Sequence, residues 1–203
     1  MKINKVAVIG AGLMGSGIAA QVANAGFPVT LLDIVPDGAT NRNVIAESAV
    51  RKMLKPVKLG SPAPLMHKKN AKLITTGNID DNLDLIKDAD LIIEVVLERL
   101  DIKHDVFIKI QKHRKKGSIV TSNTSTIPRE QLVKGMSESF AKDFMITHFF
   151  NPPRYLRLLE IVSGSEVSSD KVQIVSDFCD INLGKEIVVC NDTPGFIGNR
   201  IGT

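Results

Sequence analysis

The sequence has little that points to a metal site, a membrane or a processing signal. Its two cysteines, Cys179 and Cys190, lack the spacing of metal ligands, and unpatterned thiols are typical of a reducing compartment. No stretch approaches the roughly 18 apolar residues of a membrane span. Met1 leads directly into a predicted strand, which leaves no room for a cleaved signal. We therefore predict no metal, no membrane span and a cytoplasmic location.

The sequence also lacks a concentrated charge of either sign. Lys and Arg number 26 against 22 Asp and Glu, and the charges are interleaved apart from residues 112–116 (KHRKK). This pattern gives little support to nucleic-acid binding, whereas a modest positive surface suits a phosphorylated small molecule. The length of 203 residues and hydrophobic content of 43% suit one large α/β domain with a full core.

The most specific motif lies at the N-terminus. Residues 5–9 (KVAVI) form a predicted buried strand, and Gly10, Gly12 and Gly15 follow it in the pattern GxGxxG. A helix up to residue 26 and a second strand ending in Asp33 complete a dinucleotide-binding unit. The helix N-terminus faces the pyrophosphate, and Asp33 accepts hydrogen bonds from the adenosine ribose. Because a 2′-phosphate would meet a like charge there, we predict NAD rather than NADP.

The rest of the chain alternates strands with helices, which predicts a Rossmann-type, doubly wound and mostly parallel sheet. In such sheets ligands bind beyond the carboxyl ends of the strands. Polar groups fall at these ends at Asp33, Glu98, residues 122–125 and His148. Further strands are predicted at 74–76, 91–97, 118–121 and 186–189, and helices at 43–53, 81–87, 102–116 and 169–182, with a last helix starting at Thr193 and Pro194.

Residues 55–72 interrupt this pattern with prolines and a basic cluster at 67–72. They suit either a solvated excursion or a basic rim near the phosphates of a bulky ligand, and the sequence does not distinguish the two.

A histidine and an acid lie twelve residues apart in residues 145–160 (MITHFFNPPRYLRLLE). His148 ends a predicted strand, a turn follows through Asn151, and the next apolar run carries Glu160. The two side chains can meet across a hairpin-like connection, and an imidazole held by a carboxylate is a simple general base near neutral pH. On these residues alone, an ordinary structural hydrogen bond is the commoner reading of such a pair.

Five ordered blocks together resemble the NAD-binding domain of L-3-hydroxyacyl-CoA dehydrogenases over essentially the whole chain. They are VAVIGAGLMGSGIA, ADLIIEVVLERLDIK, TSNTSTIP, HFFNPP with LLEIV, and NDTPGFIGNR. The basic excursion more weakly resembles larger proteins in which this dehydrogenase is fused to an enoyl-CoA hydratase.

The resemblance implies a role for individual residues. It makes His148 the catalytic base and Glu160 its orienting acid, with Ser125 and Asn199 at the reacting end of the substrate. From the residues alone, Ser125 also suits a helix cap, Asn151 a turn former and Lys103 a solvated helix charge. The cofactor contacts that it implies are Gly10, Gly12, Leu13, Met14, Gly15, Asp33, Glu98, Lys103, Ser125 and Asn151.

The resemblance also implies domain organisation and partners. Residues 1–190 would be the NAD-binding domain, and residues 191–203 would begin the linker into a C-terminal helical domain that this chain lacks. In the family that domain closes over the acyl-CoA and usually forms the homodimer, so we expect the isolated chain to turn over poorly.

The expected reaction is the reversible NAD-dependent oxidation of (S)-3-hydroxyacyl-CoA to 3-oxoacyl-CoA in fatty acid β-oxidation. Two alternatives stay open: the same fold acting on a free hydroxy acid or sugar acid, and a nucleotide-binding module without turnover.

Overall fold

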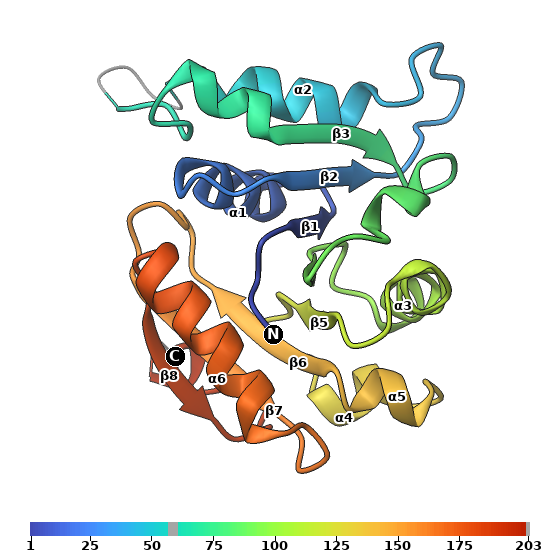
Figure 1. Ribbon diagram of the computed structural model, residues 1–203, viewed down its shortest axis with the longest axis vertical. Helices are drawn as coiled ribbons and strands as arrows, with labels where there is room; N and C mark the ends of the chain where they lie inside the picture. The colour runs from blue at the N-terminus through green and yellow to red at the C-terminus, as the bar shows by residue number, and fades with distance from the viewer. Residues whose placement is uncertain (57–60, 202–203) are drawn as a thin grey trace.

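The computed structural model describes residues 1–56 and 61–201 and contains one eight-stranded sheet (Figure 1). The strand order is β3-β2-β1-β4-β5-β6-β7-β8, and every neighbouring pair is parallel except β6 with β7. The predicted mostly parallel α/β sheet is therefore confirmed. The strands are β1 Val6–Ile9, β2 Val29–Asp33, β3 Ile74–Asn78, β4 Leu91–Glu94, β5 Ile119–Ser122, β6 Phe144–Phe149, β7 Leu158–Ser163 and β8 Glu186–Cys190.

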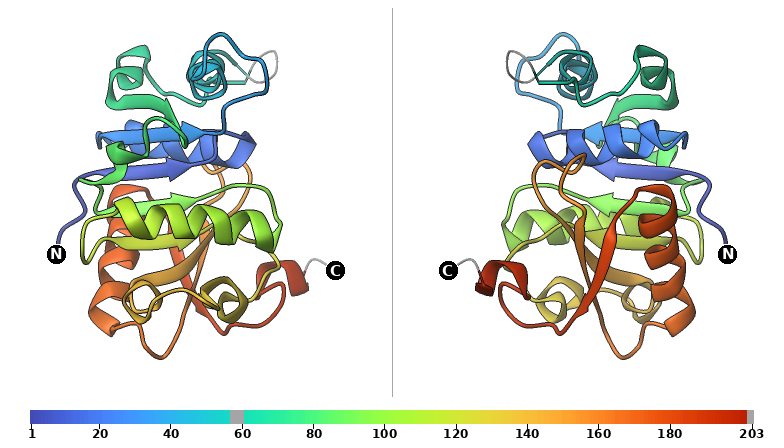
Figure 2. Two further views of the ribbon diagram at one scale, coloured as in Figure 1. Left: turned by 90° about the vertical axis from the view of Figure 1, so that its right-hand side faces the viewer. Right: turned by 90° about the vertical axis from the view of Figure 1, so that its left-hand side faces the viewer.

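Helices cover both faces of the sheet, as the two views of Figure 2 show. One face carries α1, α2 and α6, and the other carries α3, α4 and α5. The helices are α1 Leu13–Asn24, α2 Val44–Met53, α3 Leu100–His113, α4 Arg129–Val133, α5 Glu138–Ala141, α6 Ser169–Asp177 and α7 Gly198–Ile201. Shorter turns are the 3-10 helices η1 Lys68–Leu73 and η2 Leu83–Ile86, and the π-helical turn η3 Phe178–Asn182 that continues α6.

Alternation along the strands divides the core into two layers. In β1, Val6 and Val8 pack under α1, whereas Ala7 and Ile9 face the layer of α3. Successive strand side chains point to opposite faces, and a parallel sheet covered by helices on both faces needs both sets apolar. The buried run KVAVI is the sequence signature of this arrangement.

Some predicted boundaries were wrong. The strand expected at 91–97 ends at Glu94, and the chain then turns, bringing Val95 against the glycine loop. Residues 81–87 form only the 3-10 turn η2. The helix expected to start at Thr193 begins at Gly198, because the amide of Phe196 closes a turn onto Thr193 instead. Helices α4 and α5 had not been predicted.

Helix α2 and the segment that follows it agree in part with what the sequence predicted. The helix at 43–53 is confirmed as α2, and the basic cluster starts the 3-10 helix η1 beside α1. The side chain of Asn24 in α1 holds this segment, donating to Pro64 O and accepting from the amide of Met66, at 2.9 Å each. Residues 57–60, which were part of the predicted basic excursion, lie outside the described residues.

Candidate functional site

The glycine loop between β1 and α1 has the close packing that a dinucleotide site needs. Gly10 has φ +110°, and a Cβ there would lie 2.4 Å from the carbonyl oxygen of Val95. A Cβ on Gly15 would lie 1.8 Å from Gly10 O, so the helix can approach the strand only at a glycine. A Cβ on Gly12 would meet nothing within 4 Å. The first and third glycines therefore serve packing, whereas the second leaves open space at the start of α1.

Asp33 lies at the end of β2, next to this loop. Its carboxylate accepts hydrogen bonds from the amide of Ala11 at 2.5 Å and from the amide of Ile34 at 2.6 Å. Leu13 is exposed and Met14 half-buried at the first turn of α1. An open helix N-terminus beside a carboxylate on the neighbouring strand fits the pyrophosphate and ribose of NAD.

His148 and Glu160 form a buried pair across β6 and β7. They are directly opposite each other in the antiparallel register, and His148 Nδ1 lies 2.7 Å from Glu160 Oε2. A carboxylate only accepts, so Nδ1 carries a hydrogen, and in the neutral imidazole Nε2 then has the lone pair. Ser125 Oγ lies 3.1 Å from that Nε2 atom, and its hydroxyl donates to it. The predicted meeting of His148 and Glu160 is confirmed.

The second carboxylate oxygen of Glu160 holds the segment that carries Asn199. Glu160 Oε1 accepts from the amides of Ile197 at 2.9 Å and Gly198 at 2.6 Å. Asn199 Nδ2 in turn donates to Ser125 O at 3.2 Å. One buried acid thus orients the imidazole and fixes the start of α7. The rings of Phe150 and Phe196 pack around the His148 imidazole, with centroids 4.5 and 5.7 Å away.

Glu98 and Lys103 lie next to Ser125. Glu98 Oε1 accepts from the amides of Ser125 at 2.9 Å and Thr126 at 3.1 Å, and from Thr124 Oγ1 at 2.5 Å. Burial alone would raise the pKa of Glu98, but the Thr124 hydroxyl and the Lys103 charge lower it below its usual value. The reading of Lys103 as a solvated helix charge is wrong. Its side chain is 1% exposed and its ammonium pairs with Glu98 and with Glu94.

The structure gives individual roles to residues that had none from the sequence. Glu94 is completely buried beneath the Ser125 loop, and its signal was a single acid inside the apolar run LIIEVVL. Asn123 Oδ1 accepts from the amide of Phe149 at 2.8 Å and so links the ends of β5 and β6. Lys185 is buried and donates to Pro153 O and Leu156 O. It fixes the turn after β6 in which Asn151 lies exposed; no local pattern marked it.

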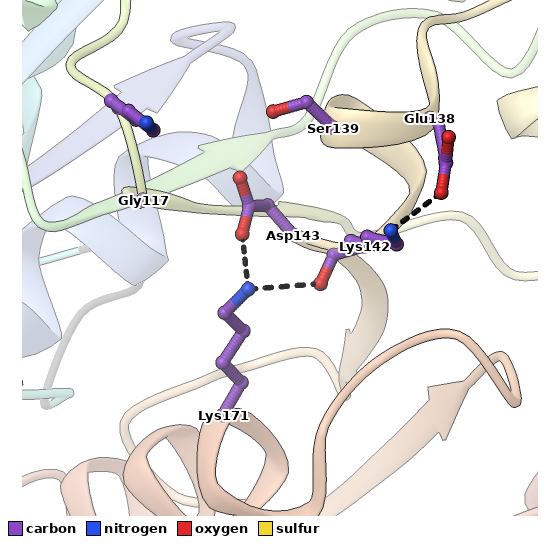
Figure 3. A pocket seen from close by; sticks show the side chains of 7 residues that line it. Gly117, Glu138, Ser139, Lys142, Asp143 and Lys171 are labelled. Carbon is purple, nitrogen blue, oxygen red and sulfur yellow. Dashed lines mark hydrogen bonds and ion pairs between the residues drawn. The ribbon is translucent and has the colours of Figure 1, made fainter.

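A hollow lies at the opposite edge of the sheet, where β5 and β6 begin (Figure 3). It has a volume of about 350 Å³. Two of its lysines already have partners, because Lys142 pairs with Glu138 and Lys171 pairs with Asp143, each at 2.5 Å. The described lining of this hollow therefore consists of ion-paired side chains and has no counterpart of the glycine loop or of the His148–Glu160 pair at the other edge.

Within 1–56 and 61–201, no group of three or more His, Cys, Asp or Glu side chains could hold a metal ion. In the same residues no helix combines the length and apolar character needed to cross a membrane.

The fold and the site define a dinucleotide-binding domain with a buried His–Glu pair at the same sheet edge as the glycine loop. The family described as "3-hydroxyacyl-CoA dehydrogenase, NAD binding domain" matches residues 5–193. The chain belongs to this family, and its cofactor is NAD.

Named relatives agree with this assignment. The chain is 48% identical to a probable 3-hydroxyacyl-CoA dehydrogenase of Deinococcus radiodurans, covering 100% of this chain and 57% of the relative. It is 46% identical to a putative fatty acid oxidation complex trifunctional enzyme of Rickettsia felis, over 99% of this chain and 27% of that protein. Both relatives are therefore considerably longer than the region they share with this chain.

A solved structure supports the same fold. The crystal structure of 3-hydroxybutyryl-CoA dehydrogenase from Escherichia coli has 29% sequence identity and a TM-score of 0.78. The match covers 100% of this chain and 41% of that one.

Proposed function

We propose that this domain provides the NAD site and the catalytic base of an enzyme that reversibly oxidises (S)-3-hydroxyacyl-CoA to 3-oxoacyl-CoA in fatty acid β-oxidation. The observation that carries the proposal is the row Ser125–His148–Glu160 at the same sheet edge as the glycine loop. A buried imidazole with one nitrogen held by a carboxylate and the other at a substrate-facing serine is suited to moving a proton to or from a hydroxyl.

The side chains divide the work of that proton transfer. NAD, when bound, supplies the acceptor for the hydride that leaves C3. His148 Nε2 accepts the proton of the substrate hydroxyl, and Glu160 stabilises the imidazolium that forms. The Ser125 hydroxyl and the Asn199 amide hold the oxygen that becomes the carbonyl. In the reverse direction His148 returns the proton to that oxygen.

Specificity for the cofactor and the substrate arises at two further places. Asp33 favours NAD over NADP, because a 2′-phosphate would lie against its carboxylate. The segment before η1 contacts the turn after β6, where Arg154 Nη1 donates to Ala63 O. Exposed Lys68 and Lys69 then form a basic rim for the phosphates of CoA.

The length of the relatives and the state of the two thiols support a proposal on partners and compartment. We infer that the dehydrogenase acts as part of a longer protein, with a homodimer formed through a C-terminal domain and an enoyl-CoA hydratase as a fused partner. The two cysteines in this chain are free and buried, which suits a reducing cytoplasmic compartment.

The test is NADH oxidation by the whole protein, followed at 340 nm, with acetoacetyl-CoA, free acetoacetate or NADPH in parallel reactions. We expect turnover that needs both NADH and the CoA thioester. Equal turnover of free acetoacetate would replace the substrate class with a free hydroxy acid. Tight NADH binding without turnover of any substrate would favour a nucleotide-binding module.

A further inference from the structure

Glu94 is a buried acid directly beneath the Ser125 loop. It is the last residue of β4, has no exposed surface, and pairs in register with Ser122 at the end of β5. Its Oε1 accepts from Lys103 Nζ at 2.8 Å and from the amide of Val96 at 2.7 Å, and its Oε2 accepts from Ser122 Oγ at 2.5 Å. Three donors therefore converge on one carboxylate.

Two routes lead from this carboxylate to Ser125. In the first, Ser122 Oγ accepts from the amide of Thr124 at 3.2 Å and so fixes the turn that leaves β5. In the second, Lys103 also pairs with Glu98 at 3.3 Å, and Glu98 accepts from the amide of Ser125 at 2.9 Å. The second route ends at the backbone amide of Ser125, whose hydroxyl contacts His148, and the first ends at the amide of the preceding residue, Thr124.

The buried charge of Lys103 explains why an acid is needed at position 94. Lys103 is 1% exposed, whereas the side chain of Glu98 is 39% exposed. Glu94 keeps the ammonium in the interior, close enough to hold Glu98 over the loop. Burial raises the pKa of Glu94, and the Lys103 charge opposes this shift. Neutralising Glu94 removes the fully buried partner of Lys103 and leaves only the partly exposed Glu98 to balance its charge, so Lys103 would relax toward solvent.

We propose that Glu94 is a positioning residue for the Ser125–His148 pair, acting through Ser122 and through Lys103 and Glu98. It does not touch the substrate. Its effect on turnover rests on the proposed dehydrogenase function, whereas its effect on the Ser125–His148 contact does not.

The kinetic test uses Glu94→Gln in a double-mutant cycle with Ser125→Ala. We expect Glu94→Gln to lower kcat with acetoacetyl-CoA roughly 10–100-fold, because small misplacements of reacting groups have costs of this order. In the Ser125→Ala background the same change should cost less than about 3-fold, because coupled residues are non-additive. Equal losses in both backgrounds would overturn the proposal.

The matched control is Asp143→Asn at the opposite sheet edge (Figure 3). Asp143 is also buried, and the substitution removes its ion pairs with Arg114 and Lys171, which measure 2.7 and 2.5 Å. We expect both single variants to lower the melting temperature, but only Glu94→Gln to lower kcat. A similar fall in kcat for Asp143→Asn would reduce the role of Glu94 to general stability and contradict the proposal.

A second readout is independent of turnover. In ¹⁵N spectra of the histidine side chains, Glu94→Gln should shift the His148 Nε2 signal, which reports the Ser125 contact, and leave Nδ1 in place. Ser122→Ala serves as the second variant if Glu94→Gln fails to fold. It removes the route through Ser122 without leaving a buried charge, and it should shift the Nε2 signal in the same way. An unchanged Nε2 signal in these variants would overturn the positioning role. A shifted signal in a protein that does not reduce acetoacetyl-CoA would support that role and refute the proposed function instead.

Discussion

Gly12 and Gly15 lie three residues apart, yet replacing each with alanine should have opposite consequences. Gly12 has φ −66° and ψ −168°, which alanine also adopts, and its Cβ would meet nothing within 4 Å. We expect Gly12→Ala to change the free energy of unfolding by less than about 1 kcal/mol. Because the added methyl group occupies the open space where the pyrophosphate approaches, NADH affinity should fall at least about 10-fold, equal to ~1.4 kcal/mol.

Gly15→Ala should instead damage the fold. Its Cβ would lie 1.8 Å from Gly10 O, so α1 would have to move from β1 by more than about 1 Å. Overpacking of this kind costs up to ~3 kcal/mol. For a domain of this size the loss corresponds to a fall in Tm of roughly 6–12 °C.

Thermal unfolding and NADH fluorescence titration measure both variants. Wild-type NADH affinity in a folded Gly12→Ala variant would refute the assignment of the pyrophosphate to that space. An unchanged Tm for Gly15→Ala would refute the packing argument.

Two further predictions concern buried titratable groups. Burial lowers the pKa of Lys185 to about 8 from 10.5. Between these two pH values the unfolded chain binds more protons than the folded one, so the free energy of unfolding rises with pH. Measured by urea unfolding and relative to Lys185→Met, the free energy of unfolding should increase by about 2 kcal/mol from pH 7 to 9.5. A difference that stays constant over this range would contradict the lowered pKa. Burial raises the pKa of Cys179 to about 12 and of Cys190 to about 11, which leaves roughly 10⁻⁴ and 10⁻³ as thiolate at pH 8. Ellman's reagent should therefore label the native protein slowly and the urea-unfolded protein fast, and rapid labelling of the native protein would show that the thiols are accessible.

Local patterns were enough to predict most of the sheet and the contact between His148 and Glu160. The run KVAVI followed by the glycines specified a strand, a turn and a helix within a few residues, and the structure has them as β1 and α1. His148 and Glu160 could be paired because twelve residues with a turn between two apolar runs indicate a hairpin-like connection, which is the β6–β7 pair.

The missed features depend on contacts between distant residues. Helix α4 is short, and its first amides, those of Arg129 and Glu130, are bound by the carboxylate of Asp192, more than sixty residues away. Lys103 has the sequence context of an exposed helix charge, and only the convergence of Glu94 and Glu98 buries it. No window of sequence joins Asp192 to α4. Glu94, Glu98 and Lys103 lie within ten residues of one another, but they converge only because the chain turns after Glu94, where the sequence predicted that the strand continues.

The position of the last helix has the same explanation. Thr193 and Pro194 have the local pattern of a helix start, but Glu160 binds the amides of Ile197 and Gly198. The helix begins where these long-range hydrogen bonds satisfy its first amide groups.

The most direct measurement of the proposed chemistry is single-turnover reduction of acetoacetyl-CoA by the whole protein with prebound NADH, comparing wild type with His148→Gln. If His148 transfers the proton, the rate of NADH oxidation should fall roughly 10²–10⁴-fold while the Kd for NADH changes less than about 3-fold, since the glycine loop and Asp33 do not contact the imidazole. A His148→Gln protein that oxidises NADH at the wild-type rate would show that the buried His148–Glu160 pair is structural and that the proton comes from elsewhere.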